Sequence, residues 1–296
     1  MTQERRVRVS AGEIAFVEAG DPDAPAVVLL AGGLRSCHLW RNLVPLLAPW
    51  MRVLAVDLLG SGASDSPPGA DLRLEAHAGH IRELLEVLEV DRFAVAGHGH
   101  GGGVAQLLAL GGGAEALVLI DSIAFDAWPG PSIRELRARS GTFDREAVDA
   151  WLRSAVDTGM SHRDRLSEED VEGYLRPFAG GDGVERFERV VASLDGQGLV
   201  GLEPRLAGLE VPALVLWGEE DRFLPVELAE RLGDALPMAT IALLPGCGHL
   251  LLEDAPETVV PLVFQYLRSR YLGTPHTHDP ATVTLQIGRP PLEDRW

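Results

Sequence analysis

The sequence has no lysine, only two cysteines and no long apolar segment. Cys37 and Cys247 form neither a CxxC pair nor a zinc-finger spacing, so we expect no disulfide framework and no metal site. Because no apolar stretch reaches about 18 residues, the sequence offers no candidate membrane span. Residues 1–6 lack the apolar core of a secretion signal, which predicts a cytoplasmic location.

The chain is acidic, since 44 Asp and Glu outnumber 26 basic residues, all of them arginine, and the formal net charge is −18. An acidic surface repels phosphate backbones and anionic lipids, so we expect neither nucleic acid nor a membrane as a partner. With 296 residues, 46% of them hydrophobic, the chain can build a large core. We expect a small-molecule substrate, no cofactor, and a monomer or homodimer.

Apolar runs alternate with helical patterns along most of the chain. After a hairpin at 5–19, strand-like runs lie at 26–30, 52–57, 93–96, 115–121, 211–217 and 240–244, and helical patterns lie at 40–47, 72–90, 104–110, 225–236 and 255–270. Continuous apolar runs are typical of strands buried on both faces. The alternation predicts an α/β fold with a mostly parallel, doubly wound sheet, whose strands end at one ligand-binding edge.

The alternation stops near residue 124 and resumes near residue 206. The segment between them holds only amphipathic stretches, which predict a helical cap inserted over the sheet edge. The predicted organisation is therefore a core of residues 1–123 and 206–272, a cap of residues 124–205, and a tail of residues 273–296. A separate helical domain is the alternative to a cap. The tail contains a strand-like patch at 282–285 and is either an ordered arm or a disordered end.

The stretch 93–103 contains the most specific pattern in the chain. A buried strand runs into Gly97-His98-Gly99-His100-Gly101, and a helical pattern follows at once. Gly97 and Gly101 suit a turn in which a side chain would clash or φ must be positive. One large enzyme class presents its nucleophile on such a strand–turn–helix, in the pattern G-x-S-x-G. Here Gly99 occupies the nucleophile position, so no covalent ester intermediate can form on it.

Five landmarks occur in an order that resembles the α/β-hydrolase fold superfamily. They are an oxyanion loop at 29–33, a D-x-x-G-x-G-x-S-D loop at 57–65, the elbow at 97–102, a W-G-x-x-D-x-x-x-P acid loop at 216–225, and a G-x-x-H loop at 246–249 followed by 253–257. The chain is similar to the capped branch that includes epoxide hydrolases, dehalogenases and esterases. The resemblance implies the α/β-hydrolase fold to about residue 270.

The resemblance also assigns catalytic roles to single residues. It implies that His249 is the general base and that Asp221 holds it in position, with Asp121 as the competing acid. A neutral imidazole accepts a proton near neutral pH, and a buried carboxylate stabilises the imidazolium that forms. Gly99 is part of this catalytic constellation because it marks the position that the nucleophile would take.

The backbone N–H groups of Gly33 and His100 would form the oxyanion hole, which depends on main-chain donors rather than on side chains. Ala31 departs from the histidine that usually precedes these glycines. The side chain of His100 is a second candidate acid or base, and the alternative is that it is part of the pocket wall. His98 is expected to be structural. No further ligand lies at a spacing that would make these histidines a metal site.

Eight apolar residues near the sheet edge or in the predicted cap are candidates for the substrate pocket. They are Leu34, Trp40, Phe125, Trp128, Trp151, Phe178, Leu224 and Leu250. Such a lining predicts a small, largely apolar substrate, although each of these residues could equally belong to the core.

Several hypotheses about function follow. In the first, a His249–Asp221 dyad activates water directly or transfers protons on the substrate, as in a lyase, isomerase or cyclase. In the second, the protein is a catalytically silent ligand-binding protein. In a third, Gly99 is an engineered replacement in an ordinary hydrolase. A weaker alternative is dinucleotide binding, because Gly97, Gly99 and Gly102 also match G-x-G-x-x-G, with Asp121 about 20 residues further on.

Overall fold

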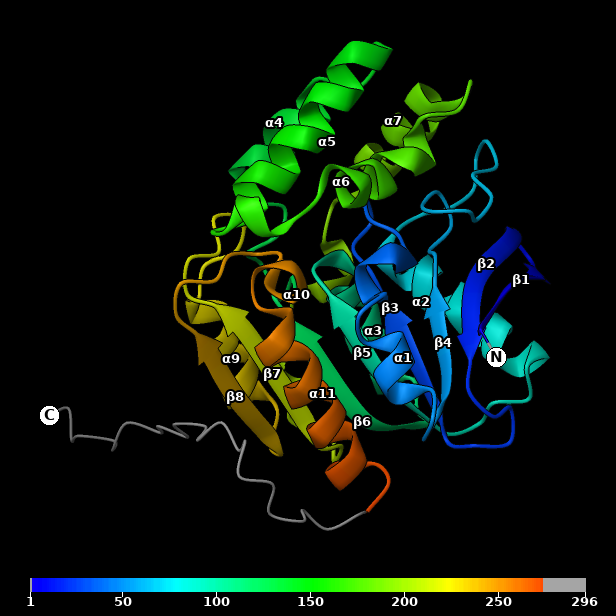
Figure 1. Ribbon diagram of the computed structural model, residues 1–296, viewed down its shortest axis with the longest axis vertical. Coiled ribbons are helices and arrows are strands. Elements are labelled where there is room, and N and C mark those ends of the chain that lie inside the picture. Colours follow the sequence, from blue (N-terminus) through cyan, green and yellow to red (C-terminus); the bar gives the residue numbers. More distant parts are fainter. Residues whose placement is uncertain (1, 274–296) are drawn as a thin grey trace, which may run out of the picture.

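The computed structural model describes residues 2–273 and consists of one sheet with helices on both faces and above one end (Figure 1). The predicted strand-like patch at 282–285, and all but the first residue of the predicted tail, lie outside the described residues.

The sheet has eight strands in the order β1-β2-β4-β3-β5-β6-β7-β8. The strands are β1 (Thr2–Val9), β2 (Gly12–Ala19), β3 (Ala26–Leu30), β4 (Arg52–Val56), β5 (Phe93–His98), β6 (Ala114–Ile120), β7 (Ala213–Gly218) and β8 (Ala239–Leu244). β1 and β2 form the predicted hairpin, β2 pairs antiparallel with β4, and all other pairs are parallel. The predicted α/β-hydrolase fold, with its mostly parallel sheet, is therefore confirmed.

The burial of the strands follows their sequences. β3, β5 and β7 are buried at every residue, as expected for apolar runs covered by helices on both faces. β1 lies at one edge of the sheet and is mostly exposed, with charged residues along its length. Charged side chains on an edge strand oppose pairing with a second chain.

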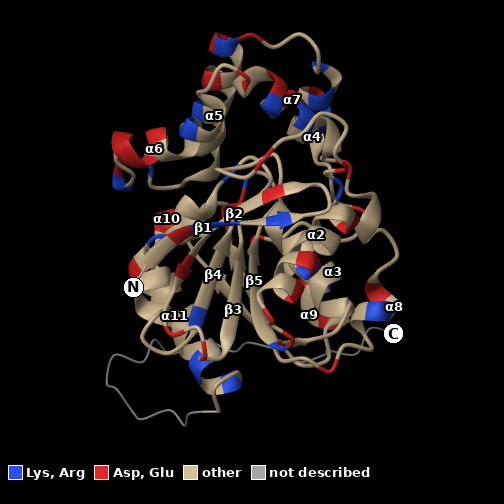
Figure 2. Cartoon of the chain, turned by 90° about the vertical axis from the view of Figure 1, so that its right-hand side faces the viewer, with Lys and Arg blue, Asp and Glu red and all other residues tan. Residues whose placement is uncertain are grey.

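Helices cover both faces of the sheet. On one face lie α1 (Val44–Leu47), α10 (Leu251–Asp254) and α11 (Pro256–Arg270), and on the other lie α2 (Leu74–Val87), α3 (His100–Leu110) and α9 (Glu227–Ala235) (Figures 1 and 2). The single helix predicted over 40–47 is wrong: a 3₁₀ turn, η1 (Cys37–Trp40), comes first and α1 begins separately. Pro45 lies in the first turn of α1, where its missing N–H is tolerated.

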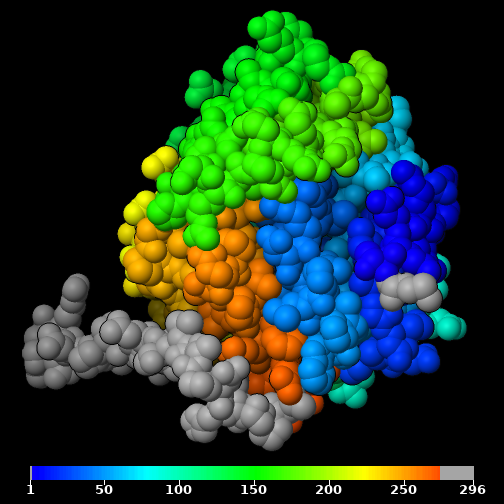
Figure 3. Space-filling model, viewed as in Figure 1, coloured from blue at the N-terminus to red at the C-terminus, as the bar shows by residue number. Residues whose placement is uncertain are grey.

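A group of helices between β6 and β7 lies above the end of the sheet toward which the parallel strands point (Figure 1). It comprises α4 (Pro131–Ala138), α5 (Arg145–Gly159), η2 (Arg163–Arg165), α6 (Glu168–Leu175), η3 (Arg176–Phe178) and α7 (Gly183–Ser193), followed by η4 (Gln197–Leu199) and α8 (Glu203–Leu206). In the space-filling view these helices, in green, sit directly on the core (Figure 3). Arg186 of α7 ties them to the core by donating to the carbonyl oxygens of Gly62 and Ser64.

Charged residues lie mostly in the helices, the loops and the segment above the sheet, whereas the central strands contain few of them (Figure 2). Within residues 2–273, none of the helices combines the length and the apolar character that crossing a bilayer requires.

Candidate active site

The elbow between β5 and α3 places Gly99 at the end of the sheet beneath the helical segment. β5 ends at His98 and α3 begins at His100, so Gly99 makes the whole turn, with φ +53° and ψ −120°. A positive φ is disfavoured for residues that carry a Cβ. Gly101 is needed for a different reason, because a Cβ on it would lie 2.3 Å from the carbonyl oxygen of Leu30.

His249 and Asp221 form a close pair beside this turn. Nδ1 of His249 lies 2.8 Å from Oδ2 of Asp221, whose side chain is completely buried. The other carboxylate oxygen accepts hydrogen bonds from the backbone N–H groups of Phe223 and Leu224, at 2.7 and 3.0 Å. Asp221 is thereby fixed, and it keeps the proton of His249 on Nδ1, which leaves Nε2 free to accept one. A Cβ added to Gly99 would lie 3.4 Å from that Nε2.

His98 fixes the backbone of His249. Its Nε2 donates to the carbonyl oxygen of His249 at 2.8 Å, and its ring lies 4.8 Å from the His249 ring. Burial, and secondarily the neighbouring His249, hold the pKa of His98 well below its usual range, so the ring is neutral. A neutral ring that donates one hydrogen bond is suited to positioning the base.

Asp121, the competing acid, has different partners. It follows β6 with φ +43°, is fully buried, and accepts a hydrogen bond from the backbone N–H of Gly218 at 2.9 Å. Its second oxygen has no hydrogen-bond partner in the described chain. Burial, together with nearby Asp221, raises the pKa of Asp121 well above its usual range. Burial therefore favours the neutral form of Asp121, whereas Asp221 is the group that contacts His249.

The backbone of Gly33 and that of His100 both line the space beside Gly99. Neither N–H donates a hydrogen bond within residues 2–273, so both remain available to an oxygen of a ligand. The hydroxyl of Ser61 donates to the carbonyl oxygen of Gly33. Ser61 therefore holds the loop at 29–33, in which Ala31 stands where the resemblance has a histidine.

The imidazole of His100 is 5% exposed, and neither ring nitrogen has a hydrogen-bond partner in the described residues. Burial lowers the pKa of His100 to about 4, so the ring is neutral at physiological pH. His77 packs edge-on against it, with ring centroids 5.9 Å apart, and His80 packs against His77 at 6.2 Å. Despite these neighbours, no group of three or more His, Cys, Asp or Glu within residues 2–273 is arranged to hold a metal ion.

A cavity of about 80 Å³ lies at this centre. Its lining comprises Gly32, Gly33, Leu34, Arg35, His98, Gly99, His100, Trp128, Ile133, Trp151, Ala155, Leu194, Phe223 and His249. The walls are therefore mainly apolar, and helices α4 and α5 supply part of them. Typical ligand pockets hold roughly 300–1,000 Å³, so this cavity suits a small molecule.

The structure brings together some of the predicted pocket residues and separates others. Leu34, Trp128 and Trp151 line the cavity. Five others do not line it and are packed in the core: Trp40, Phe125, Phe178, Leu224 and Leu250. These five side chains are buried in the protein and do not contribute to the cavity wall.

Sequence reasoning missed Arg35, Ile133, Ala155, Leu194 and Phe223 as cavity residues. Ala155 lies four residues after Trp151 on α5, so a helical face could have identified it. Arg35 lies in an irregular loop, where no periodic pattern indicates which way a side chain points.

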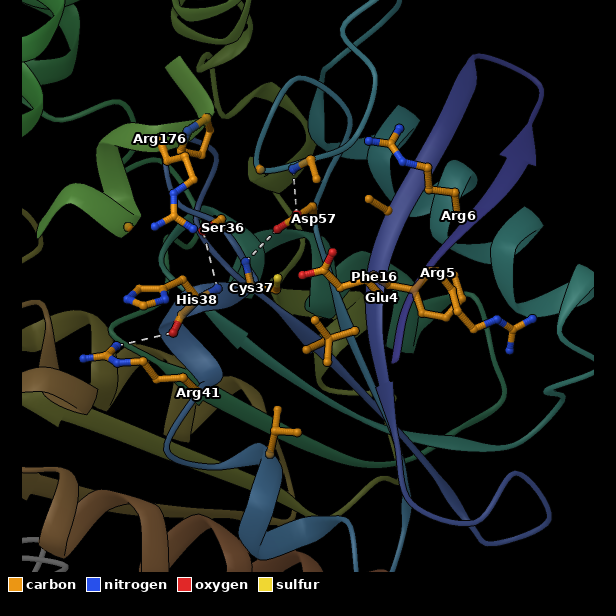
Figure 4. Close-up of a pocket in the computed structure, with 18 of the residues that line it drawn as sticks. Glu4, Arg5, Arg6, Phe16, Ser36, Cys37, His38, Arg41, Asp57 and Arg176 are labelled. Atoms are coloured by element: carbon orange, nitrogen blue, oxygen red, sulfur yellow. Dashed lines mark hydrogen bonds between the residues drawn. The ribbon is translucent and has the colours of Figure 1, made fainter. Parts of the chain in front are cut away.

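A larger cavity of about 1030 Å³ lies elsewhere, between the β2 side of the sheet and the segment that follows α6 (Figure 4). Its lining includes Arg5, Ser36, His38, Asp57 and Arg176, but none of Gly99, His100, Asp221 or His249. We therefore place the candidate active site in the smaller cavity, because that cavity contains the elbow at Gly99 and the His249 that pairs with Asp221.

Comparisons with known proteins identify the family of the chain. The model of the alpha/beta hydrolase family matches residues 27–262. The uncharacterized hydrolase YugF of Bacillus subtilis is 26% identical over 89% of this chain and 97% of its own. A 2-hydroxy-6-oxononadienedioate/2-hydroxy-6-oxononatrienedioate hydrolase of Cupriavidus pinatubonensis is 27% identical over 83% of this chain and 88% of its own.

Among solved structures, an alpha/beta hydrolase fold protein from Burkholderia ambifaria superposes with a TM-score of 0.80 and 29% identity, covering 88% of this chain and 97% of that one. The match of the family model spans most of the chain and includes the elbow, Asp221 and His249. The chain belongs to the alpha/beta hydrolase family.

Proposed function

We propose that the protein is a hydrolase in which the His249–Asp221 dyad activates a water molecule directly, with Gly99 in the position of the usual nucleophile. One observation carries this proposal: Nε2 of His249 faces Gly99 at van der Waals distance from where a Cβ would stand, while Nδ1 is held by Asp221. The base is in place, and the elbow offers no side chain for it to activate.

The reaction fits an acyl substrate whose carbonyl carbon sits over Gly99. His249 Nε2 takes a proton from water as the water oxygen bonds to that carbon. The carbonyl oxygen becomes an oxyanion, which the N–H groups of Gly33 and His100 stabilise. When the intermediate collapses, the bond to the leaving group breaks and the imidazolium of His249 returns the proton to it. The products are an acid and an alcohol or equivalent leaving group.

The cavity supports a small, largely apolar substrate, since Leu34, Trp128, Ile133, Trp151 and Phe223 form much of its wall. The helical segment of residues 124–205 acts in this proposal as a lid, because α4 contributes Ile133 to the wall and α5 contributes Trp151 and Ala155. The apolar wall and the lid around the dyad exclude bulk water, and this exclusion strengthens the electrostatic interactions within the site.

Proton transfer on the substrate itself is a second candidate, and His100 favours it. A neutral imidazole with two unpartnered nitrogens lines the same cavity as His249. One histidine could remove a proton from carbon or hydroxyl while the other returns one elsewhere on the same molecule, as in an isomerase or a lyase.

The test compares the parent with His249→Ala and Gly99→Ser on small esters, lactones and epoxides. We expect measurable hydrolysis by the parent that His249→Ala removes. For Gly99→Ser, we expect a covalent acyl-enzyme detectable by mass spectrometry, which the parent cannot form. An inert parent beside an active Gly99→Ser variant would contradict direct water attack and favour a silent binding protein. Isomerisation without hydrolysis would favour proton transfer.

A further inference from the structure

Arg35 is a buried cation on the wall of the proposed active site. It lies in the same cavity lining as Gly99, His100 and His249, and it is 9% exposed. Its positive charge also helps to lower the pKa of His98, after burial and His249. The mechanism described above gives this side chain no role.

The guanidinium of Arg35 is poorly satisfied for a buried charge. Nη2 makes a long hydrogen bond of 3.4 Å to the carbonyl oxygen of Ala155, and Nη1 has no partner. The ring of Tyr174 lies 5.1 Å from Cζ and offers a cation–π contact. None of these is a carboxylate, although buried charges are normally paired and buried arginine N–H groups are normally hydrogen-bonded.

Glu253 is the carboxylate whose charge acts on Arg35, and it already has other hydrogen-bond partners. Glu253 accepts two hydrogen bonds from Arg41, at 2.6 and 2.8 Å, and another from the hydroxyl of Tyr174. It forms no ion pair with Arg35. Glu253 therefore pairs with Arg41, and it acts on Arg35 only through its charge and without an ion pair.

We propose that Arg35 binds a carboxylate of the substrate, so that the substrate is a small molecule with an acid group at one end and the hydrolysable bond at the other. Guanidinium and carboxylate are matched in charge and in planar geometry, and such hydrogen bonds strengthen away from water. Nη1 is covered by protein, so this pairing requires a small turn of the guanidinium toward the cavity. The apolar walls then contact the chain between the two groups.

This inference rests on the proposed function only in taking the cavity at Gly99 as the place where the substrate binds. It can therefore be tested by binding alone. Butyrate and butyramide have nearly the same shape, but only butyrate carries a charge. Calorimetric titration of the full-length parent should show tighter binding of butyrate, by tenfold or more on the scale of a charge-assisted hydrogen bond.

Arg35→Met should abolish that preference, whereas Arg35→Lys should keep part of it. Arg176→Met is the matched control, because Arg176 lines the larger cavity and its side chain has no ion pair or hydrogen bond in the described chain. It should leave the preference intact. Equal binding of butyrate and butyramide by the parent would overturn the proposal, as would butyrate binding that is lost in Arg176→Met and retained in Arg35→Met.

His249→Ala separates this inference from the proposed function. In that variant the preference for butyrate should survive while hydrolysis is lost. If the parent hydrolyses substrates, half-esters of dicarboxylic acids should be preferred over the corresponding diesters, and Arg35→Met should remove the preference. Hydrolysis that is indifferent to the free acid group would refute the carboxylate assignment and leave the dyad mechanism standing. If Arg35→Met fails to fold, the parent's own discrimination and Arg35→Lys still decide the question.

Discussion

Gly99 and Nε2 of His249 face each other across the elbow, and a Cβ on Gly99 would lie 3.4 Å from that nitrogen without clashing. Space therefore does not exclude a side chain at this position. The backbone conformation disfavours a side chain at Gly99 instead, because φ is +53° there. Glycine relieves a strain that any other residue at this turn would impose.

Replacing Gly99 by serine should lower the free energy of unfolding by about 1–3 kcal/mol, the usual range for a side chain held in a sparsely populated backbone region. Urea denaturation measures the change. Gly79→Ala is the matched control, because Gly79 lies in α2 with an ordinary φ and open space around it. That variant should gain about 0.5–1 kcal/mol. Equal stability of parent and Gly99→Ser would contradict the strain argument.

Asp221→Asn should reduce the rate of any His249-dependent reaction on the order of 10²–10⁴-fold, since the amide cannot stabilise the imidazolium or hold the same tautomer. Asp121→Asn should leave the rate nearly unchanged, because Asp121 contacts the backbone of Gly218 rather than His249. Steady-state kinetics of both variants distinguish the two acids. The reverse ranking would reassign the role to Asp121.

Ser61→Ala should lower kcat roughly three- to tenfold with little change in KM, the size expected when one hydrogen bond that positions an oxyanion donor is lost. Its hydroxyl donates to the carbonyl oxygen of Gly33. Ser66→Ala serves for comparison, because Ser66 is close by in sequence and accepts only from Arg189. A Ser61→Ala enzyme as fast as the Ser66→Ala enzyme would show that the oxyanion loop does not need this contact.

The buried histidines should make stability fall as pH drops. The pKa of His100 is about 4 in the folded protein, below the unfolded value of about 6.5. Between these values the unfolded chain binds more protons, so stability is lost as pH falls, by up to about 1.4 kcal/mol per pH unit. The change in the denaturation midpoint between pH 5 and pH 7 should therefore be smaller in His100→Phe than in the parent. The corresponding difference in stability should be on the order of this slope.

Asp121 has the opposite effect on the pH dependence of stability. Burial raises its pKa well above the unfolded value of about 3.9. Above that unfolded value the folded protein holds the extra proton, so this contribution to stability is lost as pH rises toward the folded pKa. Asp121→Asn cannot titrate, and its stability should decline less than that of the parent as pH increases. Thermal melts over a series of increasing pH values would reveal the difference, and parallel curves would argue against a neutral Asp121.

The sequence by itself determined the sheet and the chain order of the reactive groups. Strands buried on both faces need continuous apolar runs, and the elbow needs glycine where backbones meet, so both leave local patterns. The strand at 93–98 and the turn at Gly99 could therefore be predicted from the sequence. Asp221 and His249 could be predicted as a pair from the motifs in which they lie.

The tertiary structure alone decided which way side chains point. Trp40 and Leu250 share the sheet edge with Leu34, yet only Leu34 lines the cavity. The sequence also did not predict the buried position of Arg35 or its lack of an ion pair. That lack depends on Arg41, which pairs with Glu253 more than 200 residues further along the chain. Such competition for a partner has no local signature, since it arises only when distant segments pack together.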